Sequence, residues 1–327
     1  MQRFRLFRHG SALAAALLGL CAACFAAAAA DYPSRPVTIV VPFTPGGSTD
    51  ILARYEAEVL QRDLHGSFVV ENRPGAGGEI GISYASRAVP DGYTLLHAPS
   101  VITLLPYLKK SVSYNLAKDF EPIGLVGLTQ FGLVVSPSLP VDSVAGLIAL
   151  AKAKPGSLTY ASAGIGTPHQ IFAELFKTLT GVNIRHIPYK GSIPGLTDVA
   201  SGNVSMEFTD LAPATALIKS GKLKLIAVLG AKRDADMPAV PTVGETVPGY
   251  DAQSWQGLFA RAGTPKPIIE KVSAALAADL KRPQTAARFK AIGILAQSDT
   301  PAQFRTFIAS ESVKWGKVIR QAGIHEE

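Results

Sequence analysis

A glycine-rich stretch near the start of the chain combines residue types that bind anions. Residues 42–50, PFTPGGSTD, follow the apolar run VTIVV and precede ILARYEAEVL. The paired glycines leave backbone N–H groups uncovered, and Ser48 is a preferred N-cap for a helix that would present its positive end. The stretch lacks the G-K-[ST] ending of a P-loop and the third glycine of a dinucleotide fingerprint. We therefore expect it to bind an anion without phosphate chemistry.

A second stretch, SAGIGTPHQ at residues 162–170, repeats this pattern. Thr167 and Gln170 have the spacing of a capping box, and Pro168 fits the first position of a helix. A helix N-terminus is therefore expected directly after two glycines, as in the first stretch. His169 either donates a hydrogen bond to a bound carboxylate or has a structural role.

Other polar residues stand where predicted strands end, which in open α/β sheets is where ligands bind. Asp210 ends EFTD, Tyr189 and Lys190 end HIPYK, and Ser100 ends GYTLLHAPS. A turn role is equally compatible with Asp210 and Tyr189. Asp50 either offers its charge to a ligand or complements the dipole of the helix that follows.

The patterns of hydrolytic and metal enzymes are missing from the sequence. There is no G-x-S-x-G, no H-E-x-x-H and no pair of histidines at i, i+4. The glycine run at residues 75–81 has Ile80 where a dinucleotide fingerprint needs its third glycine, so a tight turn is the better interpretation. We expect no catalytic residue, no metal and no cofactor, and a secreted α/β enzyme is the least favoured alternative.

The first thirty residues have the layout of a secretory signal. Three arginines precede SALAAALLGLCAACFAAAAA, and an A-x-A site stands before Asp31. Cleavage after Ala30 would remove both cysteines and lower the formal net charge from +7 to +4. An uncleaved anchor and a lipoprotein acylated at Cys24 are the alternatives. The remaining basic residues are scattered, which argues against a nucleic-acid partner.

Strands rich in Val and Ile alternate with amphipathic helices, which predicts doubly wound, mostly parallel sheets with helices on both faces. One such unit occupies residues 31–130 and a second residues 131–253. The segment 254–327 adds helices, for which Thr264 and Thr300 are the expected N-caps, each followed by Pro. These helices are expected to pack on the first unit, so lobe 1 would comprise 31–130 with 254–327, lobe 2 would comprise 131–253, and the chain would cross twice.

Eight ordered stretches, spanning essentially the whole mature chain, resemble the Bug family. These are the TctC-like extracytoplasmic solute receptors of tripartite tricarboxylate transporters. The stretches are YPSRPVTIVVPFTPGGSTDILAR, VENRPGAGGEIG, PDGYTLL, YASAGIGTPHQ, HIPYKG, SGKLKLIAV, PAVPTVGE and SWQGLFARAGTPKPII. The resemblance implies a two-lobed periplasmic-binding-protein fold, or Venus flytrap, with the ligand between the lobes and no catalysis.

The resemblance also implies that backbone N–H groups, hydroxyls and ordered water hold a ligand carboxylate. Carried over by motif, the predicted ligand-binding residues are Phe43, Thr44, Gly46, Gly47, Ser48, Thr49 and Asp50 on one side, and Gly164, Gly166, Thr167, His169 and Asp210 on the other. Ser100 and Tyr189, at their strand ends, complete the predicted site.

The expected partners follow from the same resemblance. They are a small carboxylate, which could be a dicarboxylate, an aromatic carboxylate or an amino acid, and the membrane components of the transporter. A periplasmic monomer is expected, and a receptor that feeds a signalling partner is the alternative. If Asp210 faces the ligand, its carboxylate would favour an ammonium group.

Overall fold

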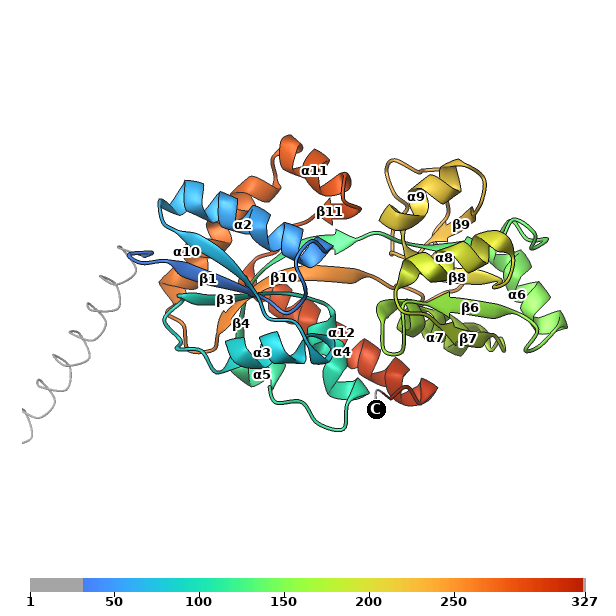
Figure 1. Cartoon of the computed structure of the whole chain (residues 1–327), viewed down its shortest axis with the longest axis horizontal. Coiled ribbons are helices and arrows are strands. Elements are labelled where there is room, and N and C mark those ends of the chain that lie inside the picture. Colours follow the sequence, from blue (N-terminus) through green and yellow to red (C-terminus); the bar gives the residue numbers. More distant parts are fainter. Residues whose placement is uncertain (1–31, 326–327) are drawn as a thin grey trace, which may run out of the picture.

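The computed structural model describes residues 32–325, so the predicted signal segment 1–30 lies outside the described residues. Two lobes lie side by side, each built on its own sheet (Figure 1). Lobe 1 has the strand order β11-β4-β10-β3-β1-β2, and lobe 2 has the order β7-β6-β8-β5-β9. The expected two-lobed α/β fold is confirmed.

Lobe 1 is formed by two segments of the chain. The first contains β1 (Val37–Val41), α2 (Ser48–Leu64), β2 (Phe68–Asn72), the 3-10 turn η1 (Ala76–Gly78), α3 (Glu79–Ser86), β3 (Thr94–Pro99), α4 (Val101–Leu108), α5 (Leu116–Asp119) and β4 (Phe120–Thr129). The second contains β10 (Ser254–Arg261), α10 (Lys266–Leu280), α11 (Pro283–Lys290), β11 (Ile294–Ala296) and α12 (Pro301–Ala322).

Lobe 2 is formed by the segment between them. It contains β5 (Phe131–Val135), α6 (Val144–Ala153), β6 (Thr159–Ser162), α7 (Pro168–Thr180), β7 (Arg185–Pro188), α8 (Ser192–Ser201), β8 (Met206–Asp210), α9 (Leu211–Lys219), β9 (Lys224–Val228) and the 3-10 turn η2 (Val243–Glu245).

Each sheet is mixed, and the expectation of mostly parallel sheets is wrong in this respect. The β-α units form parallel ladders, β1 with β2 and β3, and β6 with β7 and β8. The strands on which the chain passes between lobes enter antiparallel: β10 pairs with β3 and β4, and β5 pairs with β8 and β9. A strand that arrives from the other lobe approaches the sheet from the opposite end, which reverses its direction.

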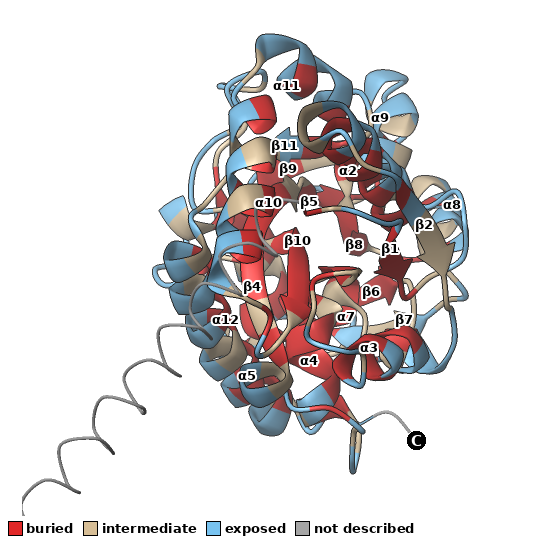
Figure 2. Ribbon diagram, turned by 90° about the vertical axis from the view of Figure 1, so that its left-hand side faces the viewer, coloured by how far each residue is buried: buried red, intermediate tan, exposed pale blue. Residues whose placement is uncertain are grey.

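Helices cover both faces of each sheet, and the buried residues lie between layers (Figure 2). In lobe 1, α2 and α10 pack on one face, while α3, α4 and the start of α12 pack on the other. In lobe 2, α6 and α7 share one apolar cluster, and α8 and α9 share another. None of the helices within residues 32–325 has the length and apolar run needed to cross a membrane.

Helix α12 contacts both lobes. Its first half buries Phe304 against Trp255 of β10, with ring centroids 5.4 Å apart. Its second half buries Trp315 against Phe172 of α7, with centroids 5.1 Å apart, and the Trp315 indole N–H donates to Glu311 at 2.8 Å. The boundaries expected for the lobes stay a proposal, because this helix belongs to the cores of both.

Of the two N-caps predicted for the C-terminal helices, Thr300 is confirmed and Thr264 is wrong. Thr300 is the N-cap of α12 and forms a complete capping box with Gln303, as predicted. Helix α10 starts one residue later than predicted, with Pro265 as N-cap, because the hydroxyl of Thr264 donates to the carbonyl of Arg261 at 2.7 Å.

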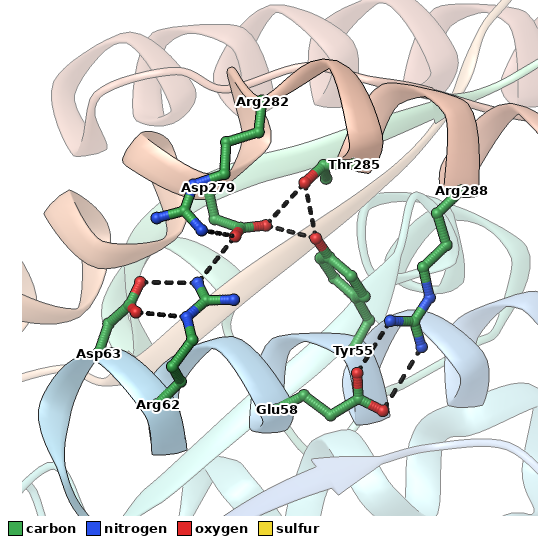
Figure 3. A network of polar contacts seen from close by, with 8 residues as sticks. All are labelled: Tyr55, Glu58, Arg62, Asp63, Asp279, Arg282, Thr285 and Arg288. Atoms are coloured by element: carbon green, nitrogen blue, oxygen red, sulfur yellow. Dashed lines mark hydrogen bonds and ion pairs between the residues drawn. The ribbon is translucent and has the colours of Figure 1, made fainter.

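A buried polar network fixes the orientation of α2 against α10 and α11 (Figure 3). Tyr55 donates its hydroxyl hydrogen to Asp279, and Arg62 and Thr285 donate to the same carboxylate at 2.8 and 2.9 Å. Burial alone would raise the pKa of Asp279, but these hydrogen bonds outweigh it and hold the pKa below its ordinary value. The carboxylate therefore stays charged and anchors the helix that carries the first predicted loop at its other end.

Candidate functional site

The first predicted loop joins β1 to the N-terminus of α2. Gly46 has a φ of +91°, a backbone conformation that favours glycine. The N-cap is Gly47, so Ser48 is the first helical residue rather than the cap, and no side chain caps the helix. The N–H groups of the first helical turn have no partner within the helix, and the helix dipole makes this end positive.

The Asp50 carboxylate, in that first turn, folds back beneath the loop. It accepts hydrogen bonds from the Gly46 N–H at 2.9 Å, from Arg54 at 3.0 Å and from Asn72 at 2.9 Å. Burial would raise the pKa of Asp50, but these donors hold it below its ordinary value. Because its oxygens accept hydrogen bonds from groups of the protein itself, Asp50 stabilises the conformation of the loop.

Asn72, at the end of β2, was not recognised from the sequence. Its amide donates both to Asp50 and to the carbonyl of Phe43 at 3.0 Å, so it fixes the two ends of the loop. The Phe43 ring lies over Gly78, where an added Cβ would stand 3.2 Å from the ring. The only signal in the sequence was the position of Asn72 at a strand end, which is the criterion that selected Asp210.

The second predicted loop occupies the corresponding position in lobe 2. It joins β6 to α7, and Gly164 and Gly166 have φ values of +131° and +76°. The predicted capping box is absent, because the Thr167 hydroxyl donates to the Gly164 carbonyl at 2.7 Å. Gln170 instead accepts from the Gly166 N–H at 2.8 Å.

The two loops are therefore stabilised by the same kind of hydrogen bond. In each, the third residue of the helix, Asp50 or Gln170, accepts a hydrogen bond from the N–H of a glycine four residues earlier. That glycine has positive φ and immediately precedes the N-cap. The turn before each helix is therefore held by a side chain of the helix itself.

The structure brings together His169 and Asp210, which are 41 residues apart in the chain. The His169 Nε2 lies 2.9 Å from Asp210 Oδ1, and the ring meets Phe131 edge-on. Glu207, which the sequence reasoning missed, places its Oε1 3.8 Å from the same Nε2. Burial raises the pKa of Glu207 to about 8, and the nearby charge of Asp210 adds to the increase.

Two further predicted residues have partners within the protein. The Tyr189 hydroxyl donates to Asp198 of α8 at 2.5 Å, and burial, followed by this contact, raises the pKa of Tyr189 to about 12. Ser100 is buried, and its hydroxyl lies 3.1 Å from that of Ser254 on β10. Ser100 thus joins the start of α4 to a strand that connects the lobes.

The predicted site residues lie close together within each lobe, but the residues of one lobe make no hydrogen bond to those of the other. No hydrogen bond within residues 32–325 links the first loop to the second. Three cavities, of about 510, 540 and 320 Å³, lie elsewhere: one between α4, α5 and α12, and two near the passage between lobes. In the described part of the chain, no group of three His, Cys, Asp or Glu side chains is placed to hold a metal.

Comparisons with known proteins agree with this architecture. A family model described as the tripartite tricarboxylate transporter family receptor (TctC) matches residues 52–324. Protein BugT of Bordetella pertussis is 38% identical over 295 residues, which cover 89% of this chain and 90% of that relative.

Two solved structures extend the comparison. R. palustris Rpa4515 with adipate superposes with a TM-score of 0.77 at 37% identity, covering 90% of this chain and 99% of that one. MatC from Rhodopseudomonas palustris with bound malate gives a TM-score of 0.71 at 29% identity, covering 88% and 100%. Adipate and malate are both small dicarboxylates.

Proposed function

The chain belongs to the tripartite tricarboxylate transporter family of receptors, and from this we propose that it is a periplasmic receptor that captures a small carboxylate between its lobes. The relatives crystallised with adipate and with malate support a carboxylate as the ligand. The predicted signal segment supports a periplasmic location. The membrane components of such a transporter are the proposed partners, and no catalysis is proposed.

The observation that carries the proposal is the ordered N-terminus of α2. Gly47 is exposed and Ser48 is half-buried, and no described residue accepts a hydrogen bond from the Gly47 N–H or the Ser48 hydroxyl. A carboxylate at this position would gain about 0.3–1 kcal/mol from the helix terminus, and about 1.5–3 kcal/mol for each well-placed hydrogen bond. Because Asp50 holds the turn in advance, little ordering cost would remain at binding.

Binding would draw the lobes together. The second loop begins at the same kind of strand end in lobe 2, so a ligand held by both loops favours the closed arrangement by its extra contacts there. Moving a two-state equilibrium from 1:99 to 99:1 needs about 5.5 kcal/mol of differential binding. A few charge-assisted hydrogen bonds from the second lobe would supply that amount.

The test is a thermal-shift panel on the mature chain, followed by calorimetry on the ligands that shift it. At a ligand concentration of 100 Kd we expect about 2.7 kcal/mol of stabilisation, seen as a rise of several degrees in Tm. Malate, adipate, succinate and benzoate are the carboxylate probes, and glucose is the uncharged control. Binding of glucose with no response to any carboxylate would contradict the proposal.

A further inference from the structure

The two loops differ in how many hydrogen-bond donors they leave for a ligand. In the lobe 2 loop, the Gly166 N–H is bound to Gln170, and the Thr167 N–H and hydroxyl both point to the Gly164 carbonyl, at 3.4 and 2.7 Å. The next residue, Pro168, has no N–H. These donors of the lobe 2 loop are therefore used within the protein.

The lobe 1 loop uses its Gly46 N–H in the same way, for Asp50, but keeps other donors. Thr44 is exposed and Ser48 is half-buried, and neither hydroxyl has a hydrogen-bond partner within residues 32–325. The Gly47 N–H is also without a partner there. One half of the predicted site is thus rich in donors, and the other is not.

Acceptors take the place of donors in lobe 2. In the parallel pairing of β6 with β8, Ala161 lies opposite Glu207, so the last residues of the two strands, Ser162 and Asp210, lie at the same edge of the sheet. Asp210 is 29% exposed, and only its Oδ1 has a partner, His169. Its Oδ2 is left to accept a hydrogen bond from outside the protein.

Behind Asp210 stand buried polar atoms with no partner within the described residues. They are both carboxyl oxygens of Glu207, the Thr209 hydroxyl oxygen and the His169 Nδ1. The Glu207 side chain is fully buried and its Oε1 faces the His169 ring nitrogen that contacts Asp210. Its Oε2 fills the space beside Gly195, where an added Cβ would come within 2.7 Å. Buried polar atoms are rarely left without partners, and Asp210, which contacts this cluster through His169, is its partly exposed member.

We propose that Asp210, with His169 and Glu207 behind it, receives the ammonium end of an amino carboxylate whose carboxylate is held by residues 43–50. The inference rests on the proposed function and names its ligand class. An ammonium group brings three donors and a positive charge to the partly exposed Asp210 carboxylate, whose Oδ2 has no partner within the described residues. A second carboxylate at the same place would meet Asp210 as a like charge, and the lobe 2 loop would offer it few donors.

Matched ligand pairs test this inference. Each pair keeps the carboxylate and the chain length and exchanges the other end: succinate against β-alanine, glutarate against 4-aminobutyrate, and adipate against 5-aminopentanoate. We expect the amino carboxylate to bind at least about tenfold more tightly in the pair whose length fits, as measured by calorimetry. Tighter binding of the dicarboxylate in all three pairs would overturn the inference and leave the proposed function standing. No binding by any of the six would count against both.

The Asp210→Asn variant supplies the second arm. It keeps the side chain's shape and removes its charge, so we expect the preference for the amino carboxylate to fall at least about tenfold. Asp142→Asn is the matched control, because Asp142 is an exposed acid that pairs with Lys224 beyond the far end of β5. An Asp210→Asn chain that keeps the wild-type preference would overturn the inference. If this variant does not fold, the wild-type preferences decide alone.

Discussion

Single carboxylates have opposite roles in the two halves of this receptor. Asp50 has three donors from its own lobe and is kept charged, whereas Glu207 is buried without a partner and its pKa is raised to about 8. The first stabilises a backbone shape, and the second is held at a cost to folding. Only the second is therefore expected to limit stability as the pH rises.

Replacing Glu207 with Gln should change how stability depends on pH. Between the ordinary value of 4.5 and about 8, the folded chain keeps a proton on Glu207 that the unfolded chain releases. Wild-type stability therefore falls as pH rises through this window, and Glu207→Gln should lose this dependence. Relative to the variant, the wild type should lose roughly 2–4 kcal/mol between pH 5 and pH 8, as measured by urea unfolding. Parallel stability profiles for the two proteins would contradict the assignment.

A substitution at Gly46 should weaken ligand binding in addition to lowering the free energy of unfolding. Alanine at its φ of +91° would be strained by about 1 kcal/mol, although no atom lies within 4 Å of the added Cβ. Gly221 is the matched control, with a φ of +70° and equally open space. We expect Gly46→Ala to weaken carboxylate binding about tenfold, and Gly221→Ala to lose similar stability with unchanged affinity. Equal affinities in the two variants would show that the turn is not part of the site.

Residue types and spacing found both loops, but not the contacts that define them. His169 and Asp210 were each proposed with open roles, since nothing in a sequence places side chains 41 positions apart within 2.9 Å. Glu207 and Asn72 were missed for the same reason. Their roles in the site depend on burial and on contacts with residues distant in the sequence, and neither can be read from the local amino-acid composition.

At the scale of elements, helix α2 has the proposed ligand-binding loop at its N-terminus and hydrogen bonds to α10 in its later turns. Its N-terminus carries the donors for the proposed carboxylate, and Tyr55 and Arg62 tie its later turns to Asp279 of α10. The helix can present its positive end in a fixed direction only if that anchor holds. The two ends should therefore respond differently to mutation.

Asp50→Ala and Asp279→Ala should separate binding from stability along this helix. Asp50→Ala removes the acceptor that holds Gly46, so we expect at least a tenfold loss of affinity and about 1–2 kcal/mol of stability. Asp279→Ala leaves Tyr55, Arg62 and Thr285 without their shared partner, and should cost about 3–5 kcal/mol with less effect on affinity. Calorimetry and urea unfolding measure the two effects. A larger loss of affinity in Asp279→Ala would contradict this division.

Helix boundaries show where sequence patterns for caps succeed. Thr300 formed its predicted capping box. Thr167 is the N-cap of α7, with Pro168 first in the helix as predicted, but its side chain makes no capping hydrogen bond, and Thr264 is not the N-cap of α10. Thr167 and Thr264 each follow a glycine with positive φ, Gly166 or Gly263, and donate to a carbonyl three residues earlier. Such a turn brings that carbonyl within reach of the hydroxyl, so the same residue type forms a different hydrogen bond.

At the scale of the whole molecule, the sequence predicted two α/β lobes and a chain that crosses twice between them. It did not predict the antiparallel strands, because β10 pairs with β3 and β4 from a position more than a hundred residues away. Periodicity reports whether a strand is buried and gives no information on its direction. For β5 and β10, the path between the lobes decided the strand direction, whereas β11 pairs antiparallel with β4 within lobe 1.

Ligand binding should make the molecule more compact. The first and second loops share no hydrogen bond within the described residues, and we expect a ligand that contacts both to bring the lobes closer together. We expect the radius of gyration from small-angle X-ray scattering to fall when the receptor is saturated, and Asp142→Asn to behave like the wild type. An unchanged radius under conditions where calorimetry shows full occupancy would exclude closure.

The apolar seam around α12 restricts the kinds of motion that remain available. Leu104 and Leu108 of α4, with Trp315 and Ile319 of α12, form one continuous cluster with the core of lobe 2. Sliding of one lobe over the other would break the apolar contacts of this cluster, whereas rotation about the cluster would keep most of them. We therefore expect closure to be a rotation about this seam, with the smallest displacement beside α12 and the largest at the side of the molecule opposite α12.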